Sequence, residues 1–240
     1  MKKIIAFNWK MNPASNKEVK KLFKIVSNSD TIVFPPFVYL NTQPKLKKAR
    51  LGAQNLFWEN SPRQLAGRGA FTGEISALML KNMGVKYVII GHSERRKWQQ
   101  ETDWTINKKV KTALKAGLKI ILCVGENYQI RKKGIKAVKS FIRAQLQKDL
   151  KKVNGPLIVA YEPIWAIGSG NFCKPKDALE IIKFIKEIIK PKTPVLYGGS
   201  VNSRNILDFL KYEEIDGVLV GGASVDKKEL KLILKNIYAY

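Results

Sequence analysis

Short apolar runs alternate with longer amphipathic segments along the whole chain. Each run is three to six residues long and holds many β-branched residues, which is typical of buried parallel strands. The eight runs are Ile4–Asn8, Thr31–Phe34, Leu51–Gln54, Tyr87–Ile90, Lys119–Val124, Leu157–Tyr161, Val195–Tyr197 and Gly217–Val220. The pattern therefore predicts eight strands, each followed by a connecting segment.

The connecting segments have the apolar spacing of helices that bury one face. They are Lys17–Val26, Ile75–Met83, Thr105–Lys115, Ile135–Lys152, Pro175–Lys190, Arg204–Lys211 and Asp226–Ile237. Ser76, Asp103 and Asp226 are predicted to cap helices, and Pro175 suits a first helical turn. Eight strand–helix units in 240 residues favour a closed parallel barrel over an open doubly wound sheet. No linker interrupts the pattern, so residues 1–240 are expected to form a single-domain α/β protein, a (β/α)8 barrel.

Composition narrows the class of protein further. The chain is 45% apolar, yet no segment approaches the roughly 18 uninterrupted apolar residues of a membrane span. The apolar stretch after Lys2 and Lys3 is too short for a secretory signal, so a cytoplasmic location is expected. Two cysteines, Cys123 and Cys173, and the single histidine, His92, predict free thiols and no structural metal site.

Basic residues are in large excess. Lysine and arginine number 44 against 19 acidic residues, which gives a formal net charge of +25. The lysines cluster on the polar side of predicted helices, as at 108–115, 131–136 and 227–231, which is typical of solvated outer faces. Because no basic arm, zinc-finger pattern or RNA-recognition aromatic motif accompanies them, specific nucleic-acid binding is a minor hypothesis. Non-specific attraction to polyanions at low salt is expected.

Polar and glycine residues gather where the predicted strands end. They are Asn8 and Lys10 after the first strand, 91–96 after the fourth, Glu162 at the end of the sixth, 198–200 after the seventh and 221–222 after the eighth. Barrel enzymes carry their chemistry at this end, and their phosphate sites are usually built from the last two loops. Glu162 is therefore a candidate base, although a strand-end carboxylate that only caps or forms a salt bridge has the same sequence pattern.

Six motifs occur in the order found in one known family and extend over nearly the whole chain. They are NWKMN at 8–12, GAFTGE at 69–74, GHSERR at 91–96, AYEPIWAIGSG at 160–170, YGGSVN at 197–202 and DGVLVGGAS at 216–224. Together they resemble triosephosphate isomerase, a family of TIM barrels. The resemblance implies a cofactor-free homodimeric enzyme of glycolysis and gluconeogenesis. Its reaction interconverts dihydroxyacetone phosphate and D-glyceraldehyde 3-phosphate through an enediolate.

The resemblance also implies roles for individual residues. Glu162 matches the catalytic base, and His92 matches the electrophile, a neutral donor to the substrate oxygens. Lys10 matches the substrate-binding cation, and Asn8 matches a polar contact to the substrate. Glu94 resembles a carboxylate that orients Lys10 and shares in proton shuttling, with a plain ion pair to Lys10 as the alternative.

Other matches concern the phosphate group, the lid and the scaffold. The residues that resemble the phosphate cradle are Gly168, Ser200, Gly221 and Gly222. Tyr197 resembles the residue that hydrogen-bonds the closed lid. The residues expected to be structural are Cys123 in the core, Trp9 and Trp165 in packing, and the charged Arg95 and Arg96.

Two segments depart from the family pattern. The stretch from Leu56 to Arg68 is longer than the usual loop, whose residue matching Thr72 reaches the neighbouring subunit, so an altered dimer interface is expected. The far hinge of the lid reads Asn171-Phe172-Cys173 in place of a lysine and small residues, which predicts changed lid kinetics with intact chemistry. Two alternatives stay open: another phosphosugar isomerase on the same barrel, and a binding protein that uses its basic surface.

Overall fold

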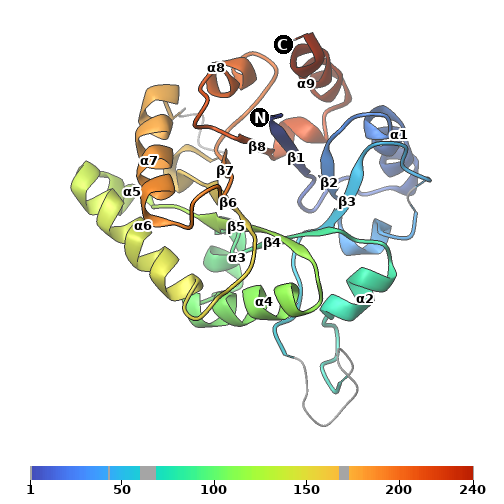
Figure 1. Ribbon diagram of the computed structural model, residues 1–240. Helices are drawn as coiled ribbons and strands as arrows, with labels where there is room; N and C mark the ends of the chain where they lie inside the picture. Colours follow the sequence, from blue (N-terminus) through green and yellow to red (C-terminus); the bar gives the residue numbers. More distant parts are fainter. Residues whose placement is uncertain (1, 43, 60–68, 168–172, 240) are drawn as a thin grey trace.

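The structure is a computed structural model that describes residues 2–42, 44–59, 69–167 and 173–239. Within these ranges, eight parallel strands follow one another in sequence order around a closed barrel (Figure 1). They are β1 (Ile4–Asn8), β2 (Ile32–Phe34), β3 (Arg50–Ala53), β4 (Tyr87–Ile90), β5 (Lys119–Val124), β6 (Ile158–Tyr161), β7 (Val195–Tyr197) and β8 (Gly217–Val220). β1 pairs with both β2 and β8, with Ile4 opposite Gly217, and this pairing closes the sheet. The predicted (β/α)8 barrel is confirmed.

Helices surround the barrel on its outer side (Figure 1). In the described ranges these are α1 (Asn16–Val26), α2 (Ala77–Asn82), α3 (Ser93–Trp98), α4 (Asp103–Lys115), α5 (Tyr128–Arg131), α6 (Ile135–Asp149), α7 (Pro175–Ile188), α8 (Ile206–Leu210) and α9 (Lys227–Ala239). Short 3₁₀ turns are η1 (Phe37–Tyr39), η2 (Ile164–Ala166) and η3 (Gly222–Ser224). Among these helices, none has the length and apolar character needed to cross a membrane.

Side-chain caps explain where several helices begin. Ser76 accepts a backbone N–H at the start of α2, and Asp226 does so ahead of α9, as predicted. The predicted cap Asp103 is wrong. Thr102 accepts the backbone N–H at the start of α4 instead, because the Asp103 carboxylate pairs with Arg96 at 2.8 Å.

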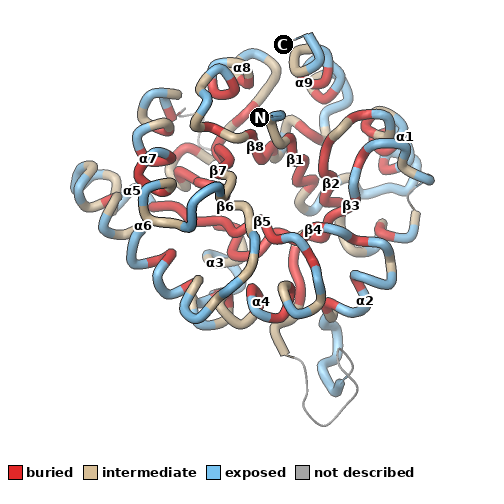
Figure 2. The backbone as a smooth tube through the Cα atoms, in the orientation of Figure 1, coloured by how far each residue is buried: buried red, intermediate tan, exposed pale blue. Residues whose placement is uncertain are grey.

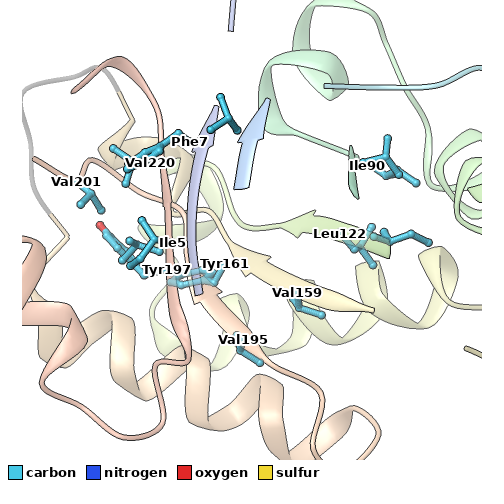
Figure 3. Close-up of a cluster of buried hydrophobic side chains, with 14 of the residues drawn as sticks. Ile5, Phe7, Ile90, Leu122, Val159, Tyr161, Val195, Tyr197, Val201 and Val220 are labelled. Atoms are coloured by element: carbon cyan, nitrogen blue, oxygen red, sulfur yellow. The ribbon is translucent and has the colours of Figure 1, made fainter. Parts of the chain in front are cut away.

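The barrel wall separates two hydrophobic clusters. One cluster contains only strand residues, such as Ala6, Ile89 and Ile121, and it fills the barrel interior. The other cluster joins the alternate strand residues to the inner faces of the helices. Figure 3 shows some of its strand members, Phe7 and Ile90 among them. Buried residues accordingly follow the strands and the inward side of each helix, while the outer helix faces are exposed (Figure 2).

The alternation of strand side chains also directs polar residues into the barrel mouth. Successive side chains of a strand point to opposite faces. Ala6 of β1 and Ala160 of β6 belong to the interior cluster. Two residues further on, Asn8 and Glu162 therefore point to the same side, at the end of the barrel where the strands finish. Both side chains are buried there.

Candidate active site

Glu162 and His92 meet at the mouth of the barrel. Glu162 follows β6 and is 1% exposed, while His92 follows β4 and is 6% exposed. His92 Nε2 lies 3.2 Å from Glu162 Oε1 without the alignment of a hydrogen bond, so among the described residues Oε1 has no hydrogen-bond partner. The other oxygen, Oε2, accepts the backbone N–H of Ser93 at 2.8 Å. One oxygen of the carboxylate is thus fixed, and the other is available to take a proton.

His92 also caps helix α3, and this contact decides which nitrogen carries its proton. Nδ1 accepts the backbone N–H of Glu94 at 3.2 Å. A nitrogen that accepts a hydrogen bond keeps its lone pair, so the neutral imidazole carries its proton on Nε2, the atom that faces Glu162. The site therefore presents an N–H donor beside a carboxylate.

Lys10 occupies a backbone conformation that L-residues rarely adopt, with φ at 52°. Two side chains hold this turn: Asn8 Oδ1 accepts the Lys10 N–H at 3.0 Å, and Gln54 Nε2 donates to the Lys10 carbonyl at 2.7 Å. The ammonium lies 2.6 Å from Glu94 Oε1. A Cβ on Gly221 would come within 3.1 Å of Lys10 Cε, so the lysine side chain runs close to the loop after β8.

Two glycines make room for the Glu162 residue. A Cβ on Gly125 would lie 1.7 Å from the Glu162 carbonyl oxygen, a separation that van der Waals radii forbid. A Cβ on Gly198 would lie 3.1 Å from Glu162 Cγ. A side chain at Gly125 is therefore excluded, whereas one at Gly198 would require the Glu162 side chain to shift by a few tenths of an ångström.

A cavity of about 350 Å³ opens between the catalytic candidates and the loops after β7 and β8. Its walls include Asn8, Lys10, His92, Glu162, residues 198–202 and residues 221–223. Ser200 Oγ donates to the Ala166 carbonyl at 2.7 Å, which ties the loop after β7 to η2. Among the described residues, nothing lies within 4 Å of a Cβ built on Gly222, so they leave the backbone there open to a ligand. A cation, glycine-rich turns, a carboxylate and an imidazole around one small cavity suit a phosphorylated carbonyl compound.

Comparison with known proteins identifies the family. The family model described as triosephosphate isomerase matches residues 3–237. The chain belongs to the triosephosphate isomerase family. The triosephosphate isomerase of Dictyoglomus turgidum is 44% identical over 245 residues, covering 93% of this chain and 95% of the relative. That of Dictyoglomus thermophilum is 42% identical over 254 residues, covering 98% and 99%. The crystal structure of triosephosphate isomerase from Bartonella henselae has a TM-score of 0.85 at 31% identity and covers 100% of both chains.

As a member of the triosephosphate isomerase family, the chain interconverts dihydroxyacetone phosphate and D-glyceraldehyde 3-phosphate, and its role in glycolysis follows from the family. The structure brings together the predicted catalytic residues Lys10, His92, Glu94 and Glu162. The same cavity is lined by the predicted substrate-binding residues Asn8, Ser200, Gly221 and Gly222. Outside the described residues lie Gly168, Asn171, Phe172 and most of the segment Leu56–Arg68. The individual roles stay predictions.

The sequence prediction overlooked a second buried carboxylate, Glu126. It accepts the Trp165 Nε1–H at 2.8 Å and the Tyr161 hydroxyl at 3.1 Å. Burial raises the pKa of Glu126, and the Trp165 hydrogen bond opposes this. Because Trp165 follows Glu162 by three residues, Glu126 fixes the chain just beyond the candidate base. An acidic residue directly after Gly125, the glycine that follows β5, is the sequence signal that could have revealed it.

The residues predicted to be structural are largely buried. Cys123 lies in the barrel interior, where burial and then the Glu162 carboxylate raise the pKa of its thiol. Trp9 packs on Phe23 with ring centroids 4.8 Å apart. Both residues therefore pack as predicted.

The last residue of the expected lid hinge, Cys173, belongs to the hydrophobic core. Cys173 is buried beside Tyr197, and burial raises the pKa of Cys173 to about 12. Tyr197 stacks on Phe209, with ring centroids 3.9 Å apart. The predicted contact of Tyr197 with the closed lid stays a prediction, because residues 168–172 lie outside the described ranges.

Proposed function

We propose that Glu162 is the base of this isomerase and that His92 is its electrophile. The observation that carries the proposal is a buried carboxylate with one oxygen, Oε1, that accepts no hydrogen bond from the described residues and lies 3.2 Å from the imidazole Nε2. Glu162 Oε1 removes a proton from the carbon beside the substrate carbonyl, and His92 Nε2–H donates to the oxygen on which negative charge develops. Return of the proton to the adjacent carbon completes the isomerisation through an enediolate. The reaction moves protons within one molecule, so it consumes no oxidant or reductant.

Lys10 and Asn8 are proposed to bind the substrate. The Lys10 ammonium supplies positive charge for both the enediolate and the phosphate, and its turn is held by Asn8 and Gln54. Glu94 is proposed to orient this ammonium, since its Oε1 lies 2.6 Å from Lys10 Nζ and its Oε2 lies 3.7 Å from His92 Nδ1. An ion pair without a part in proton transfer accounts for the first distance equally well.

The phosphate is proposed to lie against the loops after β7 and β8. Ser200, Gly221 and Gly222 line the same cavity as His92 and Glu162. Backbone N–H groups of such turns bind phosphate oxygens, and the glycines allow close approach. Gly168 belongs to the same proposed cradle on the strength of the family motif.

A homodimer is proposed for the assembled enzyme, with the Thr72 loop at the interface and a cytoplasmic location. Met11 is 93% exposed, and with Trp98 it lines a hollow that Lys10 also borders. Phe71, which precedes Thr72, is a further exposed apolar side chain. Exposed apolar residues beside an active site suit contact with a second copy. Sedimentation equilibrium tests this directly, and Met11→Glu is expected to weaken a dimer.

A coupled isomerase assay tests the proposed catalytic roles. Wild type is compared with Glu162→Asp and His92→Gln, and with Glu180→Asp as a matched control on the outer surface of α7. Each site variant is expected to lose a factor of about 100 or more in kcat/KM, while the control keeps wild-type activity. Folded site variants with full activity would overturn the assigned roles. An inactive wild type would overturn the proposed function as a whole.

A further inference from the structure

The Arg96 side chain contacts the backbone of two segments next to the active site, one at Gly91 and one at Cys123. It belongs to α3, the short helix that His92 caps, and its side chain is 14% exposed. Arg96 Nε donates to the Gly91 carbonyl at 2.9 Å, and Nη2 donates to the Cys123 carbonyl at 3.3 Å. The guanidinium thus joins the residue before His92 to the end of β5.

The two carbonyls lie just beyond the last residue pair of the β4–β5 ladder. The register of the two strands ends with Ile90 opposite Leu122, and each accepting carbonyl belongs to the next residue along the chain. Beyond this point the chain turns away at Gly91, where φ is 73°. Arg96 therefore supplies the cross-link that the turning strand can no longer make.

Space around Gly91 is limited by this contact. A Cβ there would lie 3.1 Å from Arg96 Nη2 and 3.3 Å from the Cys123 carbonyl oxygen. The absence of a side chain at Gly91 lets the guanidinium approach both strands. Its position is consequently defined by close packing as well as by hydrogen bonds.

The other side of β5 holds the candidate base. Cys123 pairs with Ala160 of β6, and the next residue, Val124, accepts the backbone N–H of Glu162 at 2.8 Å. A continuous path therefore runs from Gly91 through the guanidinium and the end of β5 to Glu162. Its two ends are the backbone of the proposed electrophile and the backbone of the proposed base.

Two carboxylates form ion pairs with the same guanidinium. Nη1 lies 2.8 Å from Asp103 Oδ1 at the start of α4, and Nη2 lies 2.5 Å from Asp149 Oδ2 at the end of α6. The planar fork of arginine reaches four acceptors in different directions. A lysine ammonium has three donors at one point, so it cannot span the two strands and both acids.

We propose that Arg96 is a positioning residue for the isomerisation, setting the separation of His92 and Glu162 by linking the ends of β4 and β5. This inference rests on the proposed catalytic roles of those two residues. It assigns Arg96 more than the structural charge expected from the sequence. The side chain touches neither the reacting carboxylate nor the imidazole, so it acts through the backbone.

Arg96→Lys tests the proposal, with Arg95→Lys as the matched control. Arg95 carries the same change one residue earlier on α3, but its guanidinium pairs with the Glu101 side chain and not with strand carbonyls. Arg96→Lys is expected to lower kcat about 10- to 100-fold with KM within about threefold, since a small misplacement of catalytic groups has effects of that size. Arg95→Lys is expected to keep kcat within about threefold of wild type.

A second readout separates positioning from general stability. His92 is the single histidine of the chain, so its imidazole ¹H and ¹⁵N NMR signals are unambiguous. They are expected to move in Arg96→Lys and to stay in place in Arg95→Lys. Equal kcat and unmoved imidazole signals in folded Arg96→Lys overturn the proposal, whereas an inactive wild type overturns the proposed function itself.

Asp149→Asn covers the case in which Arg96→Lys does not fold. It removes a charge behind the guanidinium and leaves the Gly91 and Cys123 carbonyls as acceptors. The proposal predicts wild-type imidazole signals and a kcat within about threefold. Displaced imidazole signals together with a loss of kcat beyond about tenfold would show that the charge network, and not the carbonyl bridge, governs His92, and would overturn the proposal.

Discussion

Removal of Glu101 should leave a buried cation without its counter-ion. Lys109 of α4 is 3% exposed, and its Nζ lies 2.5 Å from Glu101 Oε1 and 2.7 Å from Asn55 Oδ1. Arg95 also pairs with Glu101, but its side chain is 32% exposed and reaches water. Glu101→Leu therefore isolates mainly the Lys109 ammonium, which keeps one neutral acceptor.

The magnitude follows from the burial of this pair. Breaking a buried ion pair by deleting one partner costs about 3–5 kcal/mol of unfolding free energy. For a domain of this size that corresponds to a fall in Tm of about 6–20 °C. Burial lowers the pKa of Lys109 and Glu101 opposes this, so deleting Glu101 lowers the pKa further. A lysine with a depressed folded-state pKa becomes less destabilising as pH rises, and the defect should shrink towards pH 10.

Thermal denaturation at fixed protein concentration measures the effect in wild type, Glu101→Leu, Lys109→Met and the double variant. The double variant removes the stranded charge, so Lys109→Met is expected to stabilise the Glu101→Leu background although it destabilises wild type. This reversal of sign is the critical result. If Lys109→Met costs the same in both backgrounds, the ammonium is not a buried charge that depends on Glu101, and the reasoning fails.

Three further predictions concern the site, the pH response and the surface. Gly198→Ala places a Cβ 3.1 Å from Glu162 Cγ and is expected to lower kcat about tenfold or more in steady-state kinetics. An unchanged kcat would mean that the Glu162 side chain can shift without loss of activity. Burial raises the pKa of Asp149 from 3.8 to about 7, so the folded state binds this proton more tightly than the unfolded state. The free energy of unfolding therefore falls by up to about 4 kcal/mol as pH rises through that window. The Tm of Asp149→Asn, compared with wild type from pH 4 to 8, should lack this pH-dependent loss. Lys108 Nζ lies 3.7 Å from the ring centroid of Trp104, so Lys108→Met should cost about 1 kcal/mol in urea denaturation without changing kcat, and an unchanged midpoint would contradict this.

The fold was predictable because each strand carries its own signal. Buried parallel strands are apolar on both faces, so they appear as continuous apolar runs, and counting them gave the barrel. Helix ends were less predictable, since they depend on competition for side chains. Asp103 is a good cap in isolation, but Arg96 engages its carboxylate and Thr102 caps α4 instead. The four-residue α5 is too short to carry a periodic pattern.

The site was predictable to the extent that its residues sit in motifs at strand ends. Their partners were not, because contact depends on distant segments meeting in space. Ser93 and Glu162 are 69 residues apart in sequence, yet the N–H of one binds the carboxylate of the other. Gln54 reaches Lys10 across 44 residues, and Arg96 reaches Asp149 across 53. No local pattern encodes such pairs, so the motifs predict which residues react but not what holds them.

The pairing of β1 with β8 bears on how the chain is made. During synthesis β1 leaves the ribosome before the other barrel strands. The edge of β1 that pairs with β8 stays unpaired until β8 has also left the ribosome. Gly217, the residue of β8 opposite Ile4, has no tolerance for a side chain, since a Cβ would lie 1.9 Å from the Ile4 carbonyl oxygen. A nascent chain halted before this residue would expose two strand edges to other chains. β8, the last of the eight barrel strands to be translated, therefore covers the two exposed edges through which the nascent chain could aggregate.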